Sequence, residues 1–564
     1  MKINDVERMT GLTQKAIRLY EAKGLVDIAR DDNGYRNYSC NDIETLKVIK
    51  LLREVGVTLT DIKLYLFGVI TLDELIDKRK KEIVGQAGKN SEQYLFCENI
   101  ENAIVGKKTE IDIDFTETEE IKQKSYGALS VGIDLGTTTI SAVVMDFESK
   151  EQIEVFTIPY NSYIDSKEYS EQKTDVIVDK AERLLCHILK SYQGIVGIGI
   201  TGQMHGIVYV DGNGNAVSNL INWRDKRADQ VLESGRSVCE EIKFITGESI
   251  FTGYGIATHY YNLRFGLVPD LAVGFCSIMD LFGMRLCEKK NAVTHTSVAA
   301  SFGLFDIRSG SFMTDKLDAL GIDGAFLPRV TPLTQPIGEW NGIPVTVAIG
   351  DNQASFLGSV HEPEASILVN IGTGSQISAV SDFCELSDCL ELRPFIQGKY
   401  LVCGSALCGG SAYAMLERFF RSYAVSAGMQ EVSQYKLMNS LAMGAYNRGE
   451  EGLRVDTAFC GKRADPNCRG AIKMIDEQSF TPSALILGVL KGMCEELYEF
   501  YEAFPIKKKH VVASGGAVRK NTALQKLISD RFSMPIAVNG VKEEAATGAA
   551  RFAALAVGRI EYMD

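Results

Sequence analysis

The hydrophobic pattern is clearest at residues 130–146, SVGIDLGTTTISAVVMD, where two apolar runs flank a short polar turn. Both runs are rich in β-branched and small residues, which predicts a β-hairpin with one buried face and an exposed tip. At the tip, Gly136 lets the backbone approach a ligand closely. The hydroxyls of Thr137, Thr138 and Thr139 add hydrogen-bond donors to the amides. Such a tip suits a phosphate group.

Asp134 lies beside this turn, where a carboxylate can hold a hydrated Mg²⁺ that bridges phosphate oxygens. An Asp-Leu-Gly sequence in a hairpin also occurs as a plain turn without any ligand. A second copy of the pattern favours the ligand, because NIGTGSQISAV from Asn370 repeats DLGTTTISAV with one residue inserted. Two hairpins of one design predict two related lobes that face one nucleotide. In the second hairpin the phosphate would meet Gly372, Thr373 and Gly374.

From about residue 130 to its end, the chain resembles the FGGY carbohydrate kinases. The resemblance implies an α/β fold of two actin-like, ribonuclease-H-like lobes that clamp ATP and a sugar between them, with ATP and Mg²⁺ as cofactors. It places the N-terminal lobe, with the sugar site and the first hairpin, at 128–362. The C-terminal lobe, which binds ATP, would occupy 363–564.

Gln203, Met204 and His205 match the sugar-binding Gly-Gln-Met-His-Gly of xylulokinase-like and sedoheptulokinase-like enzymes. Amide and imidazole groups suit several hydroxyls because each can donate and accept hydrogen bonds. Trp223 and Asp225 match the Trp-x-Asp that follows in the family. The ring can pack on the C–H face of a sugar, and the carboxylate can accept hydroxyl protons. A structural role in the core is the alternative for His205 and Trp223.

The segment VTVAIGDNQASF predicts a strand that ends at Gly350, with Asp351 at its tip just before a helix. A carboxylate in that position can accept a proton from a substrate hydroxyl as it attacks phosphorus. By the family's Gly-Asp-Asn/Gln, Asp351 would be the catalytic base and Asn352 a sugar contact. Simple helix capping by Asp351 is the alternative.

Two glycine turns complete the nucleotide cleft that the resemblance implies. Gly409 and Gly410 precede an amphipathic helix, and Gly515 and Gly516 join a strand to a helix, where adenosine can lie against the backbone. Asn521 would contact the base or support this loop. GIGITG, just before Gln203, formally matches a dinucleotide fingerprint. It leads into another strand rather than a helix, so the Rossmann interpretation is rejected.

The first 70 residues predict a winged helix-turn-helix, with a second helix capped by Thr13 and a wing that turns at Asn33-Gly34. YEAKGLV, NGYRNYS and REVGVTLTDIK resemble the DNA-binding domain of the MerR regulators. By that resemblance, double-stranded DNA would be contacted, mostly at its backbone, by Gln14, Lys15, Arg18, Tyr20, Arg36 and Tyr38. The alternative is a helical bundle with solvated charges. Residues 71–105 are a possible dimerisation helix, which predicts a homodimer, and 106–127 an acidic linker.

The composition narrows the function classes. The 564 residues carry a net charge of −13, which argues against a chain that coats nucleic acid along its whole surface. The 13 cysteines include no Cys-x-x-Cys pair, so neither a zinc ribbon nor a disulfide framework is indicated. The sequence has no long apolar run and its start is charged, so we expect a cytoplasmic protein without a membrane partner.

Together these features predict an ATP-dependent sugar kinase that phosphorylates a primary hydroxyl of a ketose and is fused to a DNA-binding domain. FTGYGIAT is closest to sedoheptulokinases, so the resemblance implies sedoheptulose or a related ketose such as xylulose. One rival is a sugar-responsive transcription factor whose kinase fold is a non-catalytic sensor, although Asp134, Asp351 and both hairpins retain the catalytic groups. Another is an actin-like ATPase that acts on a protein, which the sugar motif at Gln203 argues against.

Overall fold

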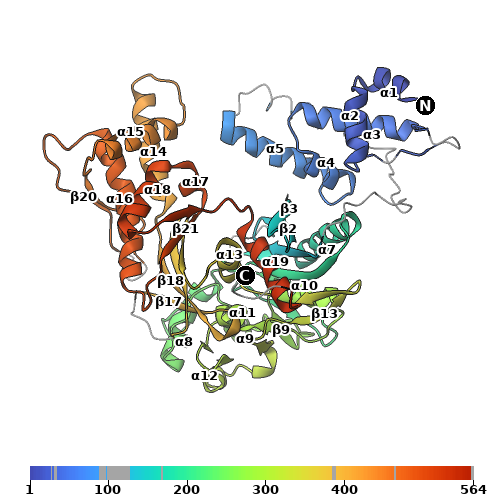
Figure 1. Cartoon of the computed structure of the whole chain (residues 1–564). Helices are drawn as coiled ribbons and strands as arrows, with labels where there is room; N and C mark the ends of the chain where they lie inside the picture. The colour runs from blue at the N-terminus through green and yellow to red at the C-terminus, as the bar shows by residue number, and fades with distance from the viewer. Residues whose placement is uncertain are drawn as a thin grey trace.

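The computed structural model describes residues 1–559 apart from 27, 31–34, 88–93, 95–96, 98–126, 165, 167–168, 384–388, 463–464 and 466. It contains an N-terminal helical domain followed by two α/β lobes (Figure 1). This architecture confirms the predicted fold class. Within the described ranges, no helix combines the length and the apolar character needed to span a bilayer.

The N-terminal domain is a compact set of helices around one apolar core. Its helices are α1 (Ile3–Thr10), α2 (Gln14–Ala22), α3 (Cys40–Glu54), α4 (Leu59–Leu66) and α5 (Leu72–Ala87). The Thr13 side chain accepts a hydrogen bond from Ala16 N at 3.2 Å, so the predicted cap of α2 is confirmed. A bridge between Arg30 and Arg36 pairs the two sides of the wing. The predicted turn at Asn33-Gly34 lies outside the described residues.

The first lobe is built on a mixed sheet with the strand order β13-β14-β5-β1-β2-β3. The strands are β1 (Leu129–Leu135), β2 (Thr139–Asp146), β3 (Glu151–Pro159), β5 (Ile195–Gly202), β13 (Pro336–Trp340) and β14 (Ile343–Thr346). Helix α19 (Glu544–Ala556) packs on one face, and α7 (Thr174–Ser191) and α10 (Ile278–Leu286) cover the other. A Cβ on Gly132 would lie 1.8 Å from Ala546 O, so this glycine allows α19 to approach the sheet.

Between β5 and β13 the chain forms a subdomain of short strands and helices. Its elements are β6 (Val208–Val210), β7 (Leu220–Ile221), α8 (Val238–Thr246), α9 (Gly255–Arg264), β8 (Gly274–Cys276), β9 (Val293–His295), α11 (Thr296–Ala299), β10 (Phe305–Asp306), β11 (Ser311–Phe312), α12 (Thr314–Ala319) and β12 (Arg329–Thr331). The short strand β4 (Glu171–Gln172) pairs with β7 and ties this subdomain to the segment after β3. Helix α13 (Asp351–Ser359) follows β14 and packs against α19.

The second lobe repeats the plan of the first. Its sheet has the order β17-β18-β16-β15-β21-β22, with strands β15 (Ser366–Ile371), β16 (Ser375–Ser381), β17 (Glu391–Pro394), β18 (Tyr400–Ala406), β21 (His510–Ser514) and β22 (Ile536–Val538). Its other elements are α14 (Gly410–Ser426), α15 (Tyr435–Asn447), β19 (Arg454–Asp456), β20 (Ala471–Lys473), α16 (Pro482–Glu502), α17 (Gly516–Lys520) and α18 (Thr522–Phe532). In both sheets an antiparallel hairpin lies beside a parallel strand, β1–β2 with β5 and β15–β16 with β21. The two predicted hairpins are therefore confirmed as equivalent parts of two related lobes.

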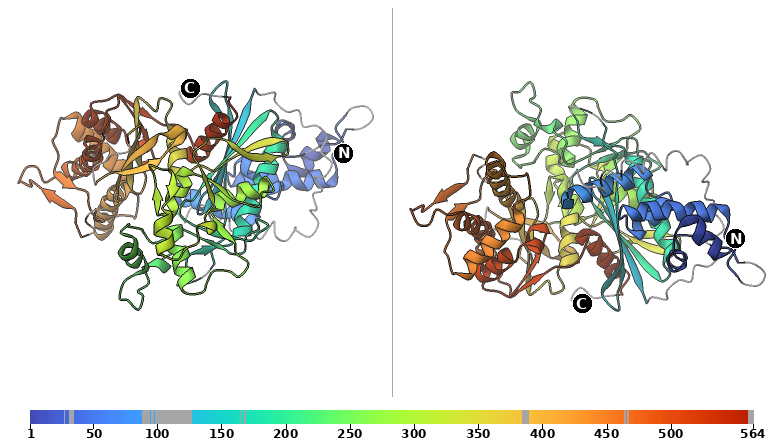
Figure 2. Two further views of the ribbon diagram at one scale, coloured as in Figure 1. Left: turned by 90° about the horizontal axis from the view of Figure 1, so that it is seen from below. Right: turned by 90° about the horizontal axis from the view of Figure 1, so that it is seen from above.

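The C-terminal helix returns to the first lobe. In both views of Figure 2, α19 lies at the centre of the molecule beside the first sheet, away from the other helices of the second lobe. Its start therefore lies in the first lobe, although the preceding strand β22 belongs to the second sheet.

The N-terminal domain is docked on the β3 edge of the first sheet, where α4 and α5 lie (Figure 1). The buried apolar residues of the domain and of the first lobe form one continuous cluster. At the contact, the ring centroids of Phe67 and His187 lie 4.6 Å apart, and Thr60 Oγ1 donates a hydrogen bond to Glu154 Oε1 at 3.1 Å. Helix α5 is the first part of the predicted dimerisation segment 71–105, of which most residues after 87 lie outside the described ranges, as does nearly all of the predicted linker.

Candidate active site

Two carboxylates lie at the same edge of the first sheet, where β1, β5 and β14 end. Asp134 lies near the end of β1, and Asp351 is the first residue of α13. Ile349 N donates to Ile200 O at 3.0 Å, so the chain reaches Asp351 alongside β5. Burial and then the negative charges of Asp351 and Glu543 raise the pKa of Asp134 to about 8. The two aspartates are thus close enough to interact, although 217 positions separate them (351 − 134).

The surroundings of Asp351 suit a proton acceptor. Burial raises its pKa to about 6, while a hydrogen bond from Asn352 and the positive charge of Arg393 limit the rise. Asn352 Nδ2 donates to Asp351 Oδ1 at 2.9 Å. Arg393 comes from β17 of the second lobe, and its buried Nη1 has no hydrogen-bond partner among the described residues. The sequence analysis missed this arginine, because only the contact between the lobes brings it to Asp351.

The first hairpin forms the predicted tip. Strand β1 ends at Leu135 and β2 begins at Thr139, with the turn between them. The hydroxyl of Tyr160 donates to Gly136 O, and Trp223 Nε1 donates to Thr137 Oγ1 at 3.2 Å. Thr138 is exposed at the end of the tip. The hairpin therefore contacts Trp223, one of the predicted sugar-binding residues.

The GQMHG segment leaves β5 as an irregular turn, and the next element is the strand β6, which agrees with rejection of a Rossmann fingerprint. His205 has a φ of 72°, and its Nδ1 lies 2.8 Å from Ser301 O. Since a carbonyl only accepts, Nδ1 carries the proton in this pair. The imidazole stacks on Tyr254 at 4.5 Å. Gln203 donates to Gln172 Oε1 at 3.1 Å, while its own buried Oε1 has no partner among the described residues.

The other three residues predicted to contact the sugar lie in different environments. Trp223 is 43% exposed, so its ring can pack on a ligand. Asn352 lies beside Asp351 and its Nδ2 is 3.9 Å from the sulfur of the buried Met204. The prediction that Asp225 contacts the sugar is corrected, because this residue is 1% exposed. Its carboxylate accepts hydrogen bonds from Ser170 N and from the Arg227 side chain at 2.8 Å each. It supports the loop and has no surface left for a sugar hydroxyl.

The second hairpin packs against the predicted glycine turns. Gly410 N donates to Gly372 O at 2.8 Å, and Gly409 N donates to Thr373 O at 3.0 Å. A Cβ on Gly409 would lie 2.3 Å from the carbonyl oxygen of Gly374. These glycines therefore hold the hairpin and the start of α14 in direct backbone contact.

The turn after β21 also contacts this hairpin. Gly515 has a φ of 93°, and a Cβ there would lie 2.3 Å from Ile371 O, whereas a Cβ on Gly516 would meet nothing within 4 Å. Of the two roles predicted for Asn521, the structure favours support of the loop, because Asn521 is 4% exposed and caps α18 through Leu524 N at 3.1 Å. Its Nδ2 donates to Asn439 Oδ1, so it supports the loop rather than contacting the base.

The predicted DNA-contacting residues divide into exposed and buried groups. Lys15 and Arg18 are exposed on α2, Gln14 is half-buried and donates to Asn4 and Glu7, and Arg36 Nε is paired with Glu21 Oε2 at 2.6 Å. Tyr20 and Tyr38 are 7% and 2% exposed and belong to the domain core, so these two predictions are corrected. Leu19, on the same helix, is 46% exposed.

The residues at the first hairpin fit a hydrated cation. No hydrogen bond to the Asp134 carboxylate is found among the described residues, and the nearby carboxylates make the site electronegative. Within the described ranges no three acidic, histidine or cysteine side chains could bind one ion together. A divalent cation there would hence keep several waters, as Mg²⁺ usually does.

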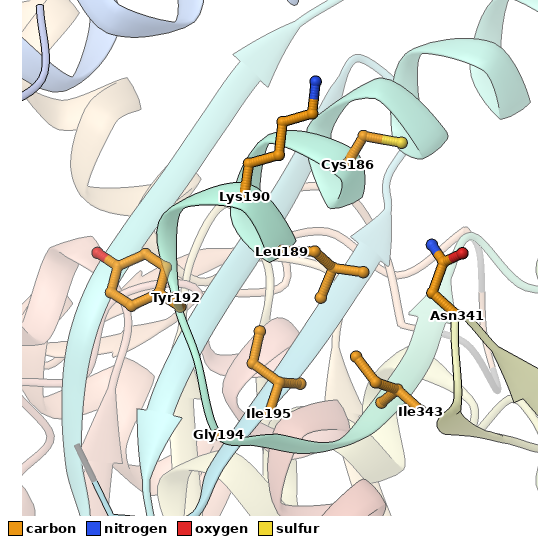
Figure 3. Close-up of a pocket in the computed structure, with 8 residues that line it drawn as sticks. All are labelled: Cys186, Leu189, Lys190, Tyr192, Gly194, Ile195, Asn341 and Ile343. Carbon is orange, nitrogen blue, oxygen red and sulfur yellow. The ribbon is translucent and has the colours of Figure 1, made fainter. Parts of the chain in front are cut away.

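A separate hollow of about 390 Å³ lies at the opposite end of β5 (Figure 3). It is lined by Cys186, Leu189, Lys190, Tyr192, Gly194, Ile195, Asn341 and Ile343. Strand β5 begins at Ile195, whereas Thr201, near its other end, pairs with Asp134. Six residues at about 3.3 Å each separate the hollow from the carboxylates by roughly 20 Å. The paired carboxylates therefore mark the candidate active site, and this hollow does not.

The fold and the site define a class, the two-lobed actin-like phosphotransferases, and here each lobe has an equivalent hairpin beside a parallel strand. Comparison with families specifies it further. Residues 129–358 match the N-terminal domain of the FGGY family of carbohydrate kinases, and residues 370–557 match the C-terminal domain. The chain belongs to the FGGY family and is an ATP-dependent carbohydrate kinase. Residues 1–67 match the MerR helix-turn-helix family of regulatory proteins, so the kinase is fused to such a domain.

Individual relatives are distant. Human sedoheptulokinase is 23% identical over 75% of this chain and 96% of its own length. A xylulose kinase from Staphylococcus xylosus is 24% identical over 76% of this chain and 91% of its own. The crystal structure of a ligand-bound xylulose kinase from Lactobacillus acidophilus superposes with a TM-score of 0.63 at 20% identity, covering 76% of this chain and 90% of the other. At this identity the structural likeness supports the fold alone.

Proposed function

We propose that the enzyme transfers the γ-phosphoryl group of MgATP to a primary hydroxyl of a ketose, with sedoheptulose and xylulose as the first candidates. The observation that carries the proposal is the position of Asp134 and Asp351 at one edge of the first sheet beside the first hairpin, where the charge of Asp351 helps to raise the pKa of Asp134. Bound Mg²⁺ would neutralise phosphate charge next to Asp134. The substrate candidates derive from the GQMHG and FTGYGIAT segments and from the names of the distant relatives.

In this proposal Asp351 accepts the proton of the attacking hydroxyl. Its pKa of about 6 leaves it ionised at neutral pH while it remains basic enough to take a proton. The NH of Arg393 that has no partner can donate to an oxygen of the transferred group, which carries negative charge during transfer. The two Gly-Thr hairpins would hold the phosphates, and Gln203, His205 and Trp223 would orient the sugar.

The substrate assignment is tested by ADP release in a coupled assay over a panel of ketoses, aldoses and polyols. We expect turnover with sedoheptulose or xylulose that is well above the background of an Asp351→Ala variant. Turnover with glycerol or an aldose alone would overturn the ketose assignment. A pure sensor would bind sugar and show no turnover above that background.

We also propose that residues 1–70 bind double-stranded DNA in a homodimer. Lys15 and Arg18 on α2 support this, because they are exposed on the helix that the turn presents. Gel filtration with light scattering tests the dimer, and selection from random duplexes tests DNA recognition. A monomer without any duplex selection would refute this part without affecting the kinase assignment.

A further inference from the structure

A row of polar residues crosses the first sheet at the level of Asp134. Asp134 of β1 pairs with Ser141 of β2, and Ser141 pairs with Thr157 of β3. Residues directly opposite on neighbouring strands point to the same face. The three side chains therefore share a face of the sheet. With strands about 4.8 Å apart, Thr157 lies roughly 10 Å from Asp134.

The start of helix α19 lies over this row. Glu543, the residue before the helix, has a φ of 50°, and its Oε1 accepts a hydrogen bond from Thr157 Oγ1 at 2.7 Å. Gln152 Nε2 donates to Lys542 O at 2.7 Å and fixes the same segment to β3. The charge of Glu543 contributes to the raised pKa of Asp134. A third carboxylate therefore acts electrostatically on the phosphate end of the site.

Thr157 also contacts the N-terminal helical domain. Its carbonyl oxygen accepts a hydrogen bond from Lys78 Nζ of α5 at 3.0 Å, and the same ammonium donates to Asp61 Oδ1 of α4 at 2.6 Å. Strand β3 is an edge strand in the described sheet, so its outward carbonyls have no neighbouring strand to bind them. The Lys78 ammonium donates a hydrogen bond to one of these carbonyls, that of Thr157. One residue of β3 thus joins the helical domain to Glu543.

We propose that Glu543 is a positioning residue of the phosphate site and that helix α5 of the N-terminal helical domain sets its position through Lys78 and Thr157. This inference rests on the proposed function and deepens it. Glu543 orients a water molecule of the hydrated Mg²⁺ beside Asp134, since the described residues offer no trio that could ligate an ion directly. Displacement of α5 moves Thr157, and Thr157 moves Glu543.

The test is a Mg²⁺ titration of ADP binding to the full chain, followed by calorimetry, which needs no turnover. Glu543→Gln keeps the size of the side chain and removes its charge, so the half-saturating Mg²⁺ concentration should rise roughly tenfold. Thr157→Val and Lys78→Met should raise it by a smaller factor. Thr157→Ser keeps the hydroxyl and should restore the wild-type requirement.

Thr60→Val is the matched control. It removes a hydrogen bond between the same helical domain and Glu154 of the same strand, but no contact with Glu543. We expect no change in its Mg²⁺ requirement. Melting curves of all variants separate loss of folding from loss of the cation.

Two results would overturn the inference. An unchanged Mg²⁺ requirement in Glu543→Gln removes Glu543 from the site. An equal shift in Thr60→Val and Lys78→Met shows that docking in general, and not the Thr157 connection, acts on the cation. Neither result depends on finding the sugar, so failure of the ketose proposal in the turnover assay remains distinguishable from failure here.

Discussion

Replacement of Asp351 by Asn tests the candidate site most directly. Asn has almost the same shape and keeps an oxygen that can accept the 2.9 Å hydrogen bond from Asn352, but it cannot take up a proton. A positioned general base contributes about 10²–10⁴-fold to a rate, equivalent to roughly 3–5 kcal/mol of activation free energy. We therefore expect kcat to fall by that factor, while ATP binding stays within about twofold.

The variant should fold at least as well as the wild type. Burial raises the pKa of Asp351 from 3.8 to about 6, so the ionised form costs folding free energy at any pH above the unfolded value. A neutral amide removes that cost, and the melting temperature at pH 7 should stay equal or rise. Asn caps a helix as well as Asp does, so a capping role alone predicts an unchanged rate in this variant, and a loss of rate identifies a catalytic carboxylate.

The pH profile supplies the second measurement. The protonated carboxyl cannot accept a proton, so wild-type kcat/KM should fall below about pH 6. The assay is coupled ADP release with saturating MgATP and sedoheptulose or xylulose. The residual rate of Asp351→Asn should not fall in this way below about pH 6.

Asp280 provides the control, because burial raises its pKa to about 7 and its carboxylate accepts hydrogen bonds from Ser277 N and Oγ at the start of α10. Asp280→Asn keeps an oxygen that can accept these hydrogen bonds and removes the cost of the buried charge, so its melting temperature at pH 7 should also stay equal or rise, while kcat and its fall at acid pH stay in place. Retention of more than a tenth of the wild-type kcat in Asp351→Asn, or an equal loss in Asp280→Asn, would refute the assignment of the base.

Other variants test the remaining parts. Arg393→Met removes a charge that lowers the pKa of Asp351, so the fall in rate at acid pH should begin at higher pH in the same assay; an unchanged pH profile contradicts the electrostatic effect of Arg393 on the base. His205→Ala should raise the ketose KM about tenfold or more and leave the calorimetric Kd for ATP unchanged. Gly515→Ala puts a Cβ 2.3 Å from Ile371 O at a φ of 93°, costs roughly 1–3 kcal/mol, and should weaken ATP binding. Arg18→Ala should weaken binding to random duplex DNA in fluorescence anisotropy and reduce the salt slope by about one, with unchanged kinase turnover.

Local patterns predicted the parts of the site that local backbone chemistry determines. The β1–β2 hairpin and its second copy from Asn370 follow from alternation of apolar residues around a glycine turn, and both form as expected. Asp351 at the start of a helix follows from the strand-turn-helix pattern. The Thr13 cap is equally local. The sequence could not supply the distance between the hairpins, because that depends on how the lobes pack.

The errors come from side chains whose partners a pattern does not identify. Asp225 was assigned to the sugar, yet Arg227, two residues on, occupies its carboxylate, and the basic residues around it were the available signal. Tyr20 lies on an amphipathic helix and Tyr38 on the wing. The residue type alone does not show whether a tyrosine there faces the core or the solvent. Glu543 and Arg393 carried no local signal, since one depends on the return of α19 to the first lobe and the other on contact between the lobes.

The helix that we propose binds DNA differs from the helices of the N-terminal domain that dock on the kinase. Lys15 and Arg18 are exposed on α2, whereas the contacts with β3 come from Thr60 of α4 and Lys78 of α5. A duplex on α2 therefore does not have to displace the kinase lobe. Any influence of DNA on phosphoryl transfer must then pass through α4 and α5 rather than arise from competition for one surface. Linkage requires the same influence in reverse, so MgATP would change DNA affinity by the same factor by which DNA changes MgATP affinity.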